Sequence, residues 1–264
     1  MELGLGNRRA LVTGSTGGIG FATARLLAGE GADVIINGRT GGRVARAIEL
    51  IREDFPGAQL TGVPADLGTQ RGCAEMVARV PAVDILVNNV GIFEPKPFEE
   101  ISDEDWLRFY EVNVMSGVRL TRHYLQRMRT AMWGRIVFVS SESAVQIPSE
   151  MIHYGMTKTA QVAIARGVAE TVAGTGITVN SVLAGPTASE GVGGFVEQLA
   201  RERGVDFPTM EREFFTTARP TSLLRRFARP DEVAAMIVFL CSEHASATTG
   251  AAVRADGGVV RAIF

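Results

Sequence analysis

Short runs of apolar and β-branched residues alternate along the chain with longer segments that are amphipathic or rich in alanine. Such runs are typical of strands, and the segments between them are typical of helices. The pattern predicts seven strands, at Ala10–Thr13, Val34–Asn37, Leu60–Pro64, Ile85–Asn88, Ile136–Ser140, Ile177–Leu183 and Ala252–Arg254. Strands that are apolar on both faces and separated by helices form parallel sheets covered on both sides. We therefore expect an α/β fold with a doubly wound, seven-stranded parallel sheet of the Rossmann type.

No repeat, low-complexity tract or linker divides the chain, so a single domain over residues 1–264 is the simpler interpretation. The alternation of strands and helices breaks once, between Gly185 and Arg229, after the sixth predicted strand. Excursions of this length at the carboxyl end of a strand are more often functional than idle. We predict a substrate lid at about residues 186–228.

The composition indicates a globular protein without a strongly charged surface. Its 264 residues are 46% hydrophobic and 21% charged, and the formal net charge is -2. Because no block of like charge could follow a phosphate backbone or an anionic membrane, nucleic acid and membranes are not expected as partners. The sequence contains no pattern of a signal peptide or a transmembrane span. A cytoplasmic protein is the expectation.

The cysteines and histidines indicate neither a metal site nor a disulfide framework. Cys73 and Cys241 lack C-x-x-C spacing and are too few for either structure. The three histidines, His123, His153 and His244, have no ligand spacing. We expect reduced cysteines and no bound metal.

A glycine-rich turn follows the first predicted strand and leads into a helix predicted at Phe21–Ala28. It reads Thr13-Gly14-Ser15-Thr16-Gly17-Gly18-Ile19-Gly20. Glycine lets backbone N–H groups and the positive end of a helix approach a pyrophosphate, which a Cβ would obstruct. Taken alone, the turn is also compatible with a tight connection between a strand and a helix.

Together with later motifs, this turn resembles the short-chain dehydrogenase/reductase family, and the resemblance spans nearly the whole chain. The family's T-G-x-x-x-G-x-G loop is matched here, Asn88-Asn89-Val90-Gly91 matches its N-N-A-G, and Asp66 matches its acidic residue at the adenine. Each motif ends a predicted strand, the edge at which open α/β sheets bind ligands. The resemblance implies cofactor contacts from Gly14, Ser15, Thr16, Gly18, Ile19, Gly20, Arg39, Asp66, Leu67, Asn89, Gly91, Tyr154, Lys158, Gly185 and Thr187. The family's P-G after the sixth strand is Ala184-Gly185 here, so the backbone loses the rigidity of proline.

The choice of cofactor depends on the end of the second predicted strand. An acidic residue there would bind the ribose hydroxyls and repel a 2′-phosphate, whereas arginine can clamp the phosphate. The chain has Asn37 and Arg39 and no acid at this point. NADP(H) is therefore favoured. NAD(H) stays open because Thr16 and Gly17 supply no second basic residue.

Candidate chemistry lies in the sequence HYGMTK, where Tyr154 and Lys158 are spaced to share one face of a helix. A free tyrosine has a pKa of about 10, and a nearby ammonium favours its phenolate. The family's spacing implies that Ser141 is the catalytic serine that stabilises charge on the substrate oxygen. It also implies that Asn113 holds a water that links the lysine to solvent.

We expect an NAD(P)(H)-dependent oxidoreductase that interconverts a secondary alcohol and a carbonyl by hydride transfer, with Tyr154 as acid and base. Its partners would be a small-molecule substrate and further copies of itself, in a homotetramer or dimer. The alternatives are a catalytically silent NAD(P)-binding sensor and a sugar-nucleotide epimerase or dehydratase. The complete set of Asn113, Ser141, Tyr154 and Lys158 favours an enzyme over a sensor. The chain leaves no room for the separate substrate domain of an epimerase, and the phenylalanines Phe195, Phe207, Phe214 and Phe215 suit an apolar-walled pocket without naming a substrate.

Overall fold

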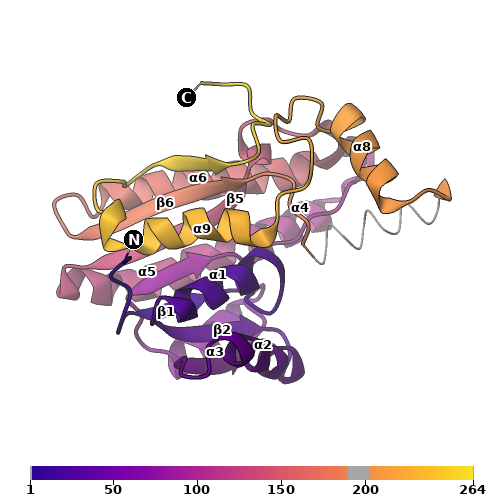
Figure 1. The fold of residues 1–264 in the computed structure, drawn as a ribbon. Coiled ribbons are helices and arrows are strands. Elements are labelled where there is room, and N and C mark those ends of the chain that lie inside the picture. Colours follow the sequence, from indigo (N-terminus) through magenta and orange to yellow (C-terminus); the bar gives the residue numbers. More distant parts are fainter. Residues whose placement is uncertain (1, 190–202, 264) are drawn as a thin grey trace.

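A seven-stranded parallel sheet forms the centre of the protein, in the spatial order β3-β2-β1-β4-β5-β6-β7. The computed structural model describes residues 2–189 and 203–263 and is drawn in Figure 1. Its strands are β1 (Arg9–Val12), β2 (Asp33–Gly38), β3 (Leu60–Pro64), β4 (Ile85–Asn88), β5 (Gly134–Ser141), β6 (Ile177–Ala184) and β7 (Ala252–Ala255). All seven predicted strands are confirmed, with small shifts at their ends.

Helices cover both faces of the sheet, which confirms the doubly wound arrangement. They are α1 (Gly18–Gly29), α2 (Gly41–Asp54), α3 (Gln70–Arg79), α4 (Asp103–Tyr110), α5 (Ser116–Ala131), α6 (Ile152–Glu170), α8 (Phe207–Thr217) and α9 (Pro230–Cys241). Four short 3-10 helices, η1 (Phe98–Glu100), η3 (Glu142–Ala144), η4 (Ser149–Met151) and η5 (Glu243–Ala245), and a π-helical turn, η2 (Glu111–Met115), complete the described part. One core packs α1, α2 and α9 against the sheet, and a second packs α3, α5 and α6 against the other face.

The alternation of strand side chains divides these two cores. In β1, Ala10 and Val12 belong to the core under α1, whereas Leu11 between them belongs to the core under α5. In β2, Ile35 likewise points away from its neighbours Val34 and Ile36. Successive side chains of a strand point to opposite faces, so strands covered on both sides must be apolar throughout. This requirement produces the continuous apolar runs in the sequence.

The first helix starts earlier than its sequence predicts. The prediction placed it at Phe21–Ala28, but α1 begins at Gly18, and the Phe21 N–H already donates to the Gly17 carbonyl at 3.1 Å. The apolar pattern could not mark this start because the first turn of the helix is built from glycine and isoleucine. The consequence is that the glycine-rich turn and the N-terminus of α1 are one structure.

The excursion after β6 carries a small core of its own. Its base is closed where Thr187 bridges Ala228, and α8 extends beyond the sheet at that end in Figure 1. Met210, Phe215 and Phe227 are buried there, with Phe207 and Phe214 packed against them. Phe195 lies outside the described residues.

No helix in the described part is long and apolar enough to cross a bilayer. Within the same residues, no three His, Cys, Asp or Glu side chains lie together as metal ligands would. Cys73 and Cys241 are both buried and unpaired. Burial raises the pKa of the Cys241 thiol to about 12, which makes this sulfur inert at neutral pH.

Candidate active site

A cavity of about 1320 Å³ runs along the carboxyl ends of the strands. Its walls come from the glycine-rich turn, the ends of β2 to β6, the start of α6 and the inner side of α8. The parallel sheet is responsible for this convergence, because the carboxyl ends of its strands meet at one edge.

The glycine-rich turn forms a cradle at one end of the cavity. Gly18 has a φ of +55°, which favours glycine, and a Cβ on Gly20 would lie 2.4 Å from Asn89 Nδ2. Gly17 caps α1 without a side-chain bond, and no acidic residue lies in the first turn. The first N–H groups and the positive end of α1 are thus left to an anionic group, as in pyrophosphate sites.

Polar side chains fix the neighbouring strand ends around this cradle. Thr13 Oγ1 accepts from the Asn89 N–H at 2.8 Å, and Asn89 Nδ2 donates to the Thr13 carbonyl at 3.0 Å. Asn37 plays the same part on the other side, since its Oδ1 accepts from the Gly14 N–H at 3.1 Å and its Nδ2 reaches the Val63 and Ala65 carbonyls. The backbone of the turn is therefore held in shape before any ligand arrives.

Arg39 follows Asn37 at the mouth of the cavity with an exposed side chain. Within residues 2–189 and 203–263, no hydrogen bond or ion pair engages its guanidinium. Arg43, from the first turn of α2, lines the same wall. The sequence offered no second basic residue from the glycine-rich turn, but the fold brings one from α2.

Most of the residues predicted for the site line the cavity. They are Gly14, Thr16, Gly18, Ile19, Arg39, Asp66, Leu67, Asn89, Gly91, Ser141, Tyr154, Lys158, Gly185 and Thr187. Ser15, Gly20 and Asn113 lie behind its wall. Ser15 is fully buried and bonded to the Asn37 backbone, and Gly20 packs on Gly14 and Asn89. Their part in the site is to shape the wall.

The predicted catalytic side chains meet where β5 ends beside α6. Ser141 is the last residue of β5, and Tyr154 and Lys158 lie in the first turns of α6. The Ser140 hydroxyl donates to the Lys158 carbonyl at 2.9 Å, and Lys158 Nζ donates to the Val139 carbonyl at 3.0 Å. These two bonds pin the helix to the strand. The ammonium lies 5.6 Å from the centre of the Tyr154 ring.

The electrostatics of Tyr154 differ from the sequence prediction. Lys158 was expected to lower the tyrosine pKa, but burial raises it, and the Glu142 carboxylate raises it further. A hydrogen bond with Ser141 opposes this shift only in part. The physical reason is that the phenol, on a half-buried side chain, is desolvated at the cavity wall, while Lys158 Nζ is directed at other acceptors. At neutral pH the phenol is therefore protonated.

Asn113 anchors the site through its side chain. Its Oδ1 accepts from the Ile92 N–H at 2.7 Å, and its Nδ2 donates to the Ile92 carbonyl and to Thr157 Oγ1, both at 3.0 Å. The residue lies in the π-helical turn η2, a form of helix that is frequent at functional sites. Asn113 thus ties the loop after β4 to α6.

The side chain of Gln161 is hydrogen-bonded to the main-chain carbonyl of Asn113. Its Nε2 donates to that carbonyl at 2.6 Å, and its Oε1 accepts from Lys158 Nζ at 3.2 Å. The Gln161 amide therefore links the Asn113 carbonyl to the lysine directly. The water that the family resemblance implies between Lys158 and solvent, held by Asn113, stays a prediction. Gln161 is 2% exposed, so the bridge is shielded from solvent.

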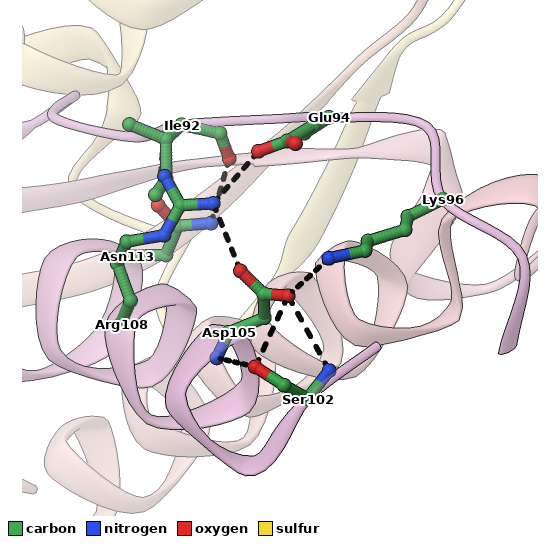
Figure 2. A network of polar contacts seen from close by, with 7 residues as sticks. All are labelled: Ile92, Glu94, Lys96, Ser102, Asp105, Arg108 and Asn113. Carbon is green, nitrogen blue, oxygen red and sulfur yellow. Dashed lines mark hydrogen bonds and ion pairs between the residues drawn. The ribbon is translucent and has the colours of Figure 1, made fainter. Parts of the chain in front are cut away.

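A network of charged groups holds the loop after β4 against α4, as Figure 2 shows. Lys96 Nζ donates to Asp105 at 2.6 Å, and Arg108 donates to Glu94 at 2.7 Å and to Asp105 at 3.3 Å. The ammonium of Lys96 holds the pKa of the Asp105 carboxyl at about 2. The loop that carries Asn89 and Gly91 is therefore fastened at its far end and, through Asn113, at its middle.

A buried ion pair lies beside the catalytic residues. The Glu142 carboxylate accepts from the Ser141 hydroxyl through Oε2 and from Arg219 Nε at 2.9 Å through Oε1. Arg219 follows α8 and also donates to Glu150 Oε1 at 3.0 Å. Glu142 and Arg219 are 4% and 8% exposed, and both line the cavity.

Sequence reasoning missed Gln161, Glu142 and Arg219. A signal existed for Gln161, because its spacing from Lys158 places the two on one helix face. Glu142 was visible only as a neighbour of Ser141. Arg219 is distant from both in sequence and carries no motif, so only the fold could reveal it.

Known proteins match this chain along nearly all of its length. A family model described as enoyl-(acyl carrier protein) reductase matches residues 14–260. The uncharacterized oxidoreductase YvaG of Bacillus subtilis is 48% identical over 264 residues, covering 100% of both chains. The 3-oxoacyl-(acyl-carrier-protein) reductase FabG of Aquifex aeolicus is 32% identical and covers 98% of this chain and 100% of its own. Among solved structures, L-sorbose reductase from Gluconobacter frateurii with NADPH and L-sorbose superposes with a TM-score of 0.94 at 32% identity, covering 100% of each chain.

Proposed function

The chain belongs to the short-chain dehydrogenase/reductase family of oxidoreductases, and from this membership we propose that it reduces a small-molecule ketone to a secondary alcohol with NADPH. The observation that carries the proposal is a protonated, half-buried tyrosine in the same cavity as the glycine-rich cradle. A phenol can give a proton to a carbonyl oxygen, whereas a phenolate would be needed to take one from an alcohol. The physical state of Tyr154 therefore favours reduction at neutral pH.

Each side chain of the site has a part in this reaction. A nicotinamide held by the glycine-rich cradle would supply the hydride for the carbonyl carbon. Tyr154 gives its phenolic proton to the carbonyl oxygen, and the Lys158 ammonium stabilises the phenolate that remains. Ser141 orients the same oxygen and stabilises the charge that develops on it. Gln161 and Asn113 hold Lys158 and the loop after β4 in position.

The cradle around Gly18 and Gly20 fits a dinucleotide pyrophosphate, because a Cβ at either position would strain the backbone or fill the space. Two cations, Arg39 and Arg43, line the wall at the end of β2, where the chain has no acidic residue. This charge favours a cofactor with a 2′-phosphate. The solved relatives with NADPH or NADP bound support the same choice.

A silent dinucleotide-binding sensor is the alternative from another class. It would need the cradle but not the phenol, so Tyr154 on the cavity wall with Ser141 and Lys158 argues for catalysis. An epimerase or dehydratase acting on a sugar nucleotide would need a second domain, and the relatives that match along the full chain are reductases and dehydrogenases.

The test is a panel of simple ketones, hydroxyketones, acyl thioesters and sugars, each offered with NADPH and with NADH. Consumption of reduced cofactor is followed by its absorbance. We expect turnover with members of the panel and a higher kcat/KM with NADPH. Tight binding of NADPH without turnover of any member would support the sensor instead.

A further inference from the structure

The buried carboxylate of Glu142 has no role in the ketone reduction assigned to Tyr154, Lys158 and Ser141. It sits in the turn η3 directly after Ser141, on the inner wall of the cavity. Burying a charge is costly unless it is paired, and a mere structural role could be filled by a neutral residue. The position of Glu142 beside the reacting groups therefore indicates a functional role.

The second partner of this carboxylate, Arg219, is already neutralised. Its Nε donates to Glu142 and its Nη1 donates to Glu150, so two carboxylates share one guanidinium. The Glu142 carboxylate would disfavour an acidic group at this wall, where Arg219 is already engaged by two carboxylates. The wall beside Ser141 thus offers hydrogen-bond acceptors and suits a neutral donor such as a hydroxyl group.

Ser141 is constrained by the same carboxylate. A serine hydroxyl carries one proton, and Ser141 gives it to Glu142 Oε2 while its own oxygen accepts from the Ser143 N–H at 3.1 Å. Ser141 can therefore donate to a substrate carbonyl only if it leaves Glu142. Hydrogen bonds to charged groups are stronger than those between neutral groups. A ligand that breaks the Ser141–Glu142 bond without donating to Glu142 itself therefore binds more weakly.

We propose that Glu142 selects neutral α-hydroxyketones, by accepting a hydrogen bond from the hydroxyl on the carbon next to the substrate carbonyl. That hydroxyl replaces Ser141 as the donor to Oε2, and the Ser141 proton turns to the carbonyl oxygen. Adjacent oxygens on the substrate thus meet adjacent residues of the chain, Ser141 and Glu142. The inference rests on the proposed ketone reduction and assigns its substrate class.

The first test needs no variant. The unmodified protein with NADPH is given 3-hydroxy-2-butanone and 2-butanone, which differ by one hydroxyl, and acetoacetate as an anionic ketone. We expect kcat/KM to be about 10- to 150-fold higher for the hydroxyketone than for butanone, as one charge-assisted hydrogen bond would provide. Acetoacetate should be the poorest of the three. Equal values for the matched pair, or a preference for acetoacetate, would overturn the assignment.

The second test changes the acceptor. Glu142→Gln should reduce the preference for the hydroxyketone at least about tenfold, because a neutral amide is a weaker acceptor. Glu150→Gln is the matched control, since it also removes a carboxylate from Arg219 but does not contact Ser141; its hydroxyketone preference should match the wild type. Should Glu142→Gln fail to fold, Glu142→Gln combined with Arg219→Gln removes both charges of the buried pair and carries the same expectation. The Glu150 carboxylate that loses Arg219 is 46% exposed and remains solvated. A preference that survives the change at Glu142 would refute its role.

These outcomes separate this inference from the reductase proposal. Turnover of both butanone and the hydroxyketone at equal kcat/KM would leave the reductase standing and remove the role of Glu142. No turnover of any ketone with either nicotinamide would remove both.

Discussion

The charge of Lys158 depends on the groups that surround its ammonium. Burial lowers its pKa to about 8, with the Glu142 carboxylate opposing the shift. The ammonium keeps two acceptors, the Val139 carbonyl and Gln161 Oε1. Because an acceptor stabilises the charged form, Gln161 sets how far the pKa can fall. The ammonium is charged below about pH 8 and is lost as the pH rises through that value.

This arrangement predicts opposite effects for two substitutions at Gln161. Gln161→Leu removes the acceptor, so the alkaline loss of ketone reduction should begin about one pH unit lower. Gln161→Glu adds a negative charge, so the loss should begin at higher pH. The measurement is the pH dependence of kcat with saturating NADPH. A purely structural role for Gln161 would lower activity in both variants without moving the profile.

A substitution at Arg39 tests the preference for NADPH over NADH. Arg39→Ala should raise the KM for NADPH by about 10- to 150-fold, because a charged clamp on the 2′-phosphate is lost, and should leave the KM for NADH nearly unchanged. Steady-state kinetics with each nucleotide provide the comparison, and Arg71→Ala, on an exposed face of α3, is the control. An equal effect on both nucleotides would show that Arg39 does not read the phosphate.

Single residues were predictable from the sequence where a motif carries them. Tyr154, Lys158 and Ser141 are recognisable by spacing, and they do line one cavity. Their electrostatics were not predictable, because the pKa of Tyr154 depends on burial and on Glu142. The partner of Glu142 comes from beyond α8, and no periodicity or spacing indicates that contact.

At the scale of elements, the strands were the easiest to predict and the start of α1 was not. A strand buried on both faces leaves an uninterrupted apolar run, but a helix that starts in glycine leaves no apolar signal. The excursion after β6 was predicted as an interruption of the pattern. Its small aromatic core depends on Phe227, which follows α8 by ten residues and which the pattern did not single out.

The core of the excursion gives a prediction for α8. Phe227 is 4% exposed and lies 5.0 Å from Phe214 and 5.1 Å from Phe215, centre to centre. Phe227→Ala should loosen α8, because such a truncation costs about 3–5 kcal/mol in a core. The KM for the ketone should rise at least about tenfold, since α8 lines the cavity, while NADPH affinity should be nearly unchanged. Phe239→Ala, on the partly exposed face of α9, is the control. An unchanged KM would show that α8 does not help bind the substrate.

At the scale of the whole molecule, the apolar residues of α5 and α6 are not all covered within one copy. Ala163 is exposed, and Val118, Val162 and Ile164 are half-buried. Apolar surface of this kind at a helix face is typical of contacts between subunits. The homo-oligomer expected from the family therefore stays a prediction with a defined surface.

Light scattering at micromolar concentration should find a mass that is a multiple of the 28.2 kDa monomer. Ala163→Glu places a charge on the exposed face of α6 and should shift the population toward smaller species. A stable monomer before any substitution would contradict the prediction.

We propose that the whole site serves one step, in which the Tyr154 phenol gives its proton to a ketone reduced with NADPH. Its most direct test is the turnover of Tyr154→Phe against that of the unmodified protein on the best ketone of the panel, at neutral pH and saturating NADPH. The ring and its packing remain, so NADPH should bind with an affinity within about twofold, while kcat falls about 10²- to 10⁴-fold. Tyr110→Phe, whose ring is 43% exposed on α4, should retain full activity. Near-normal turnover of Tyr154→Phe would contradict the account.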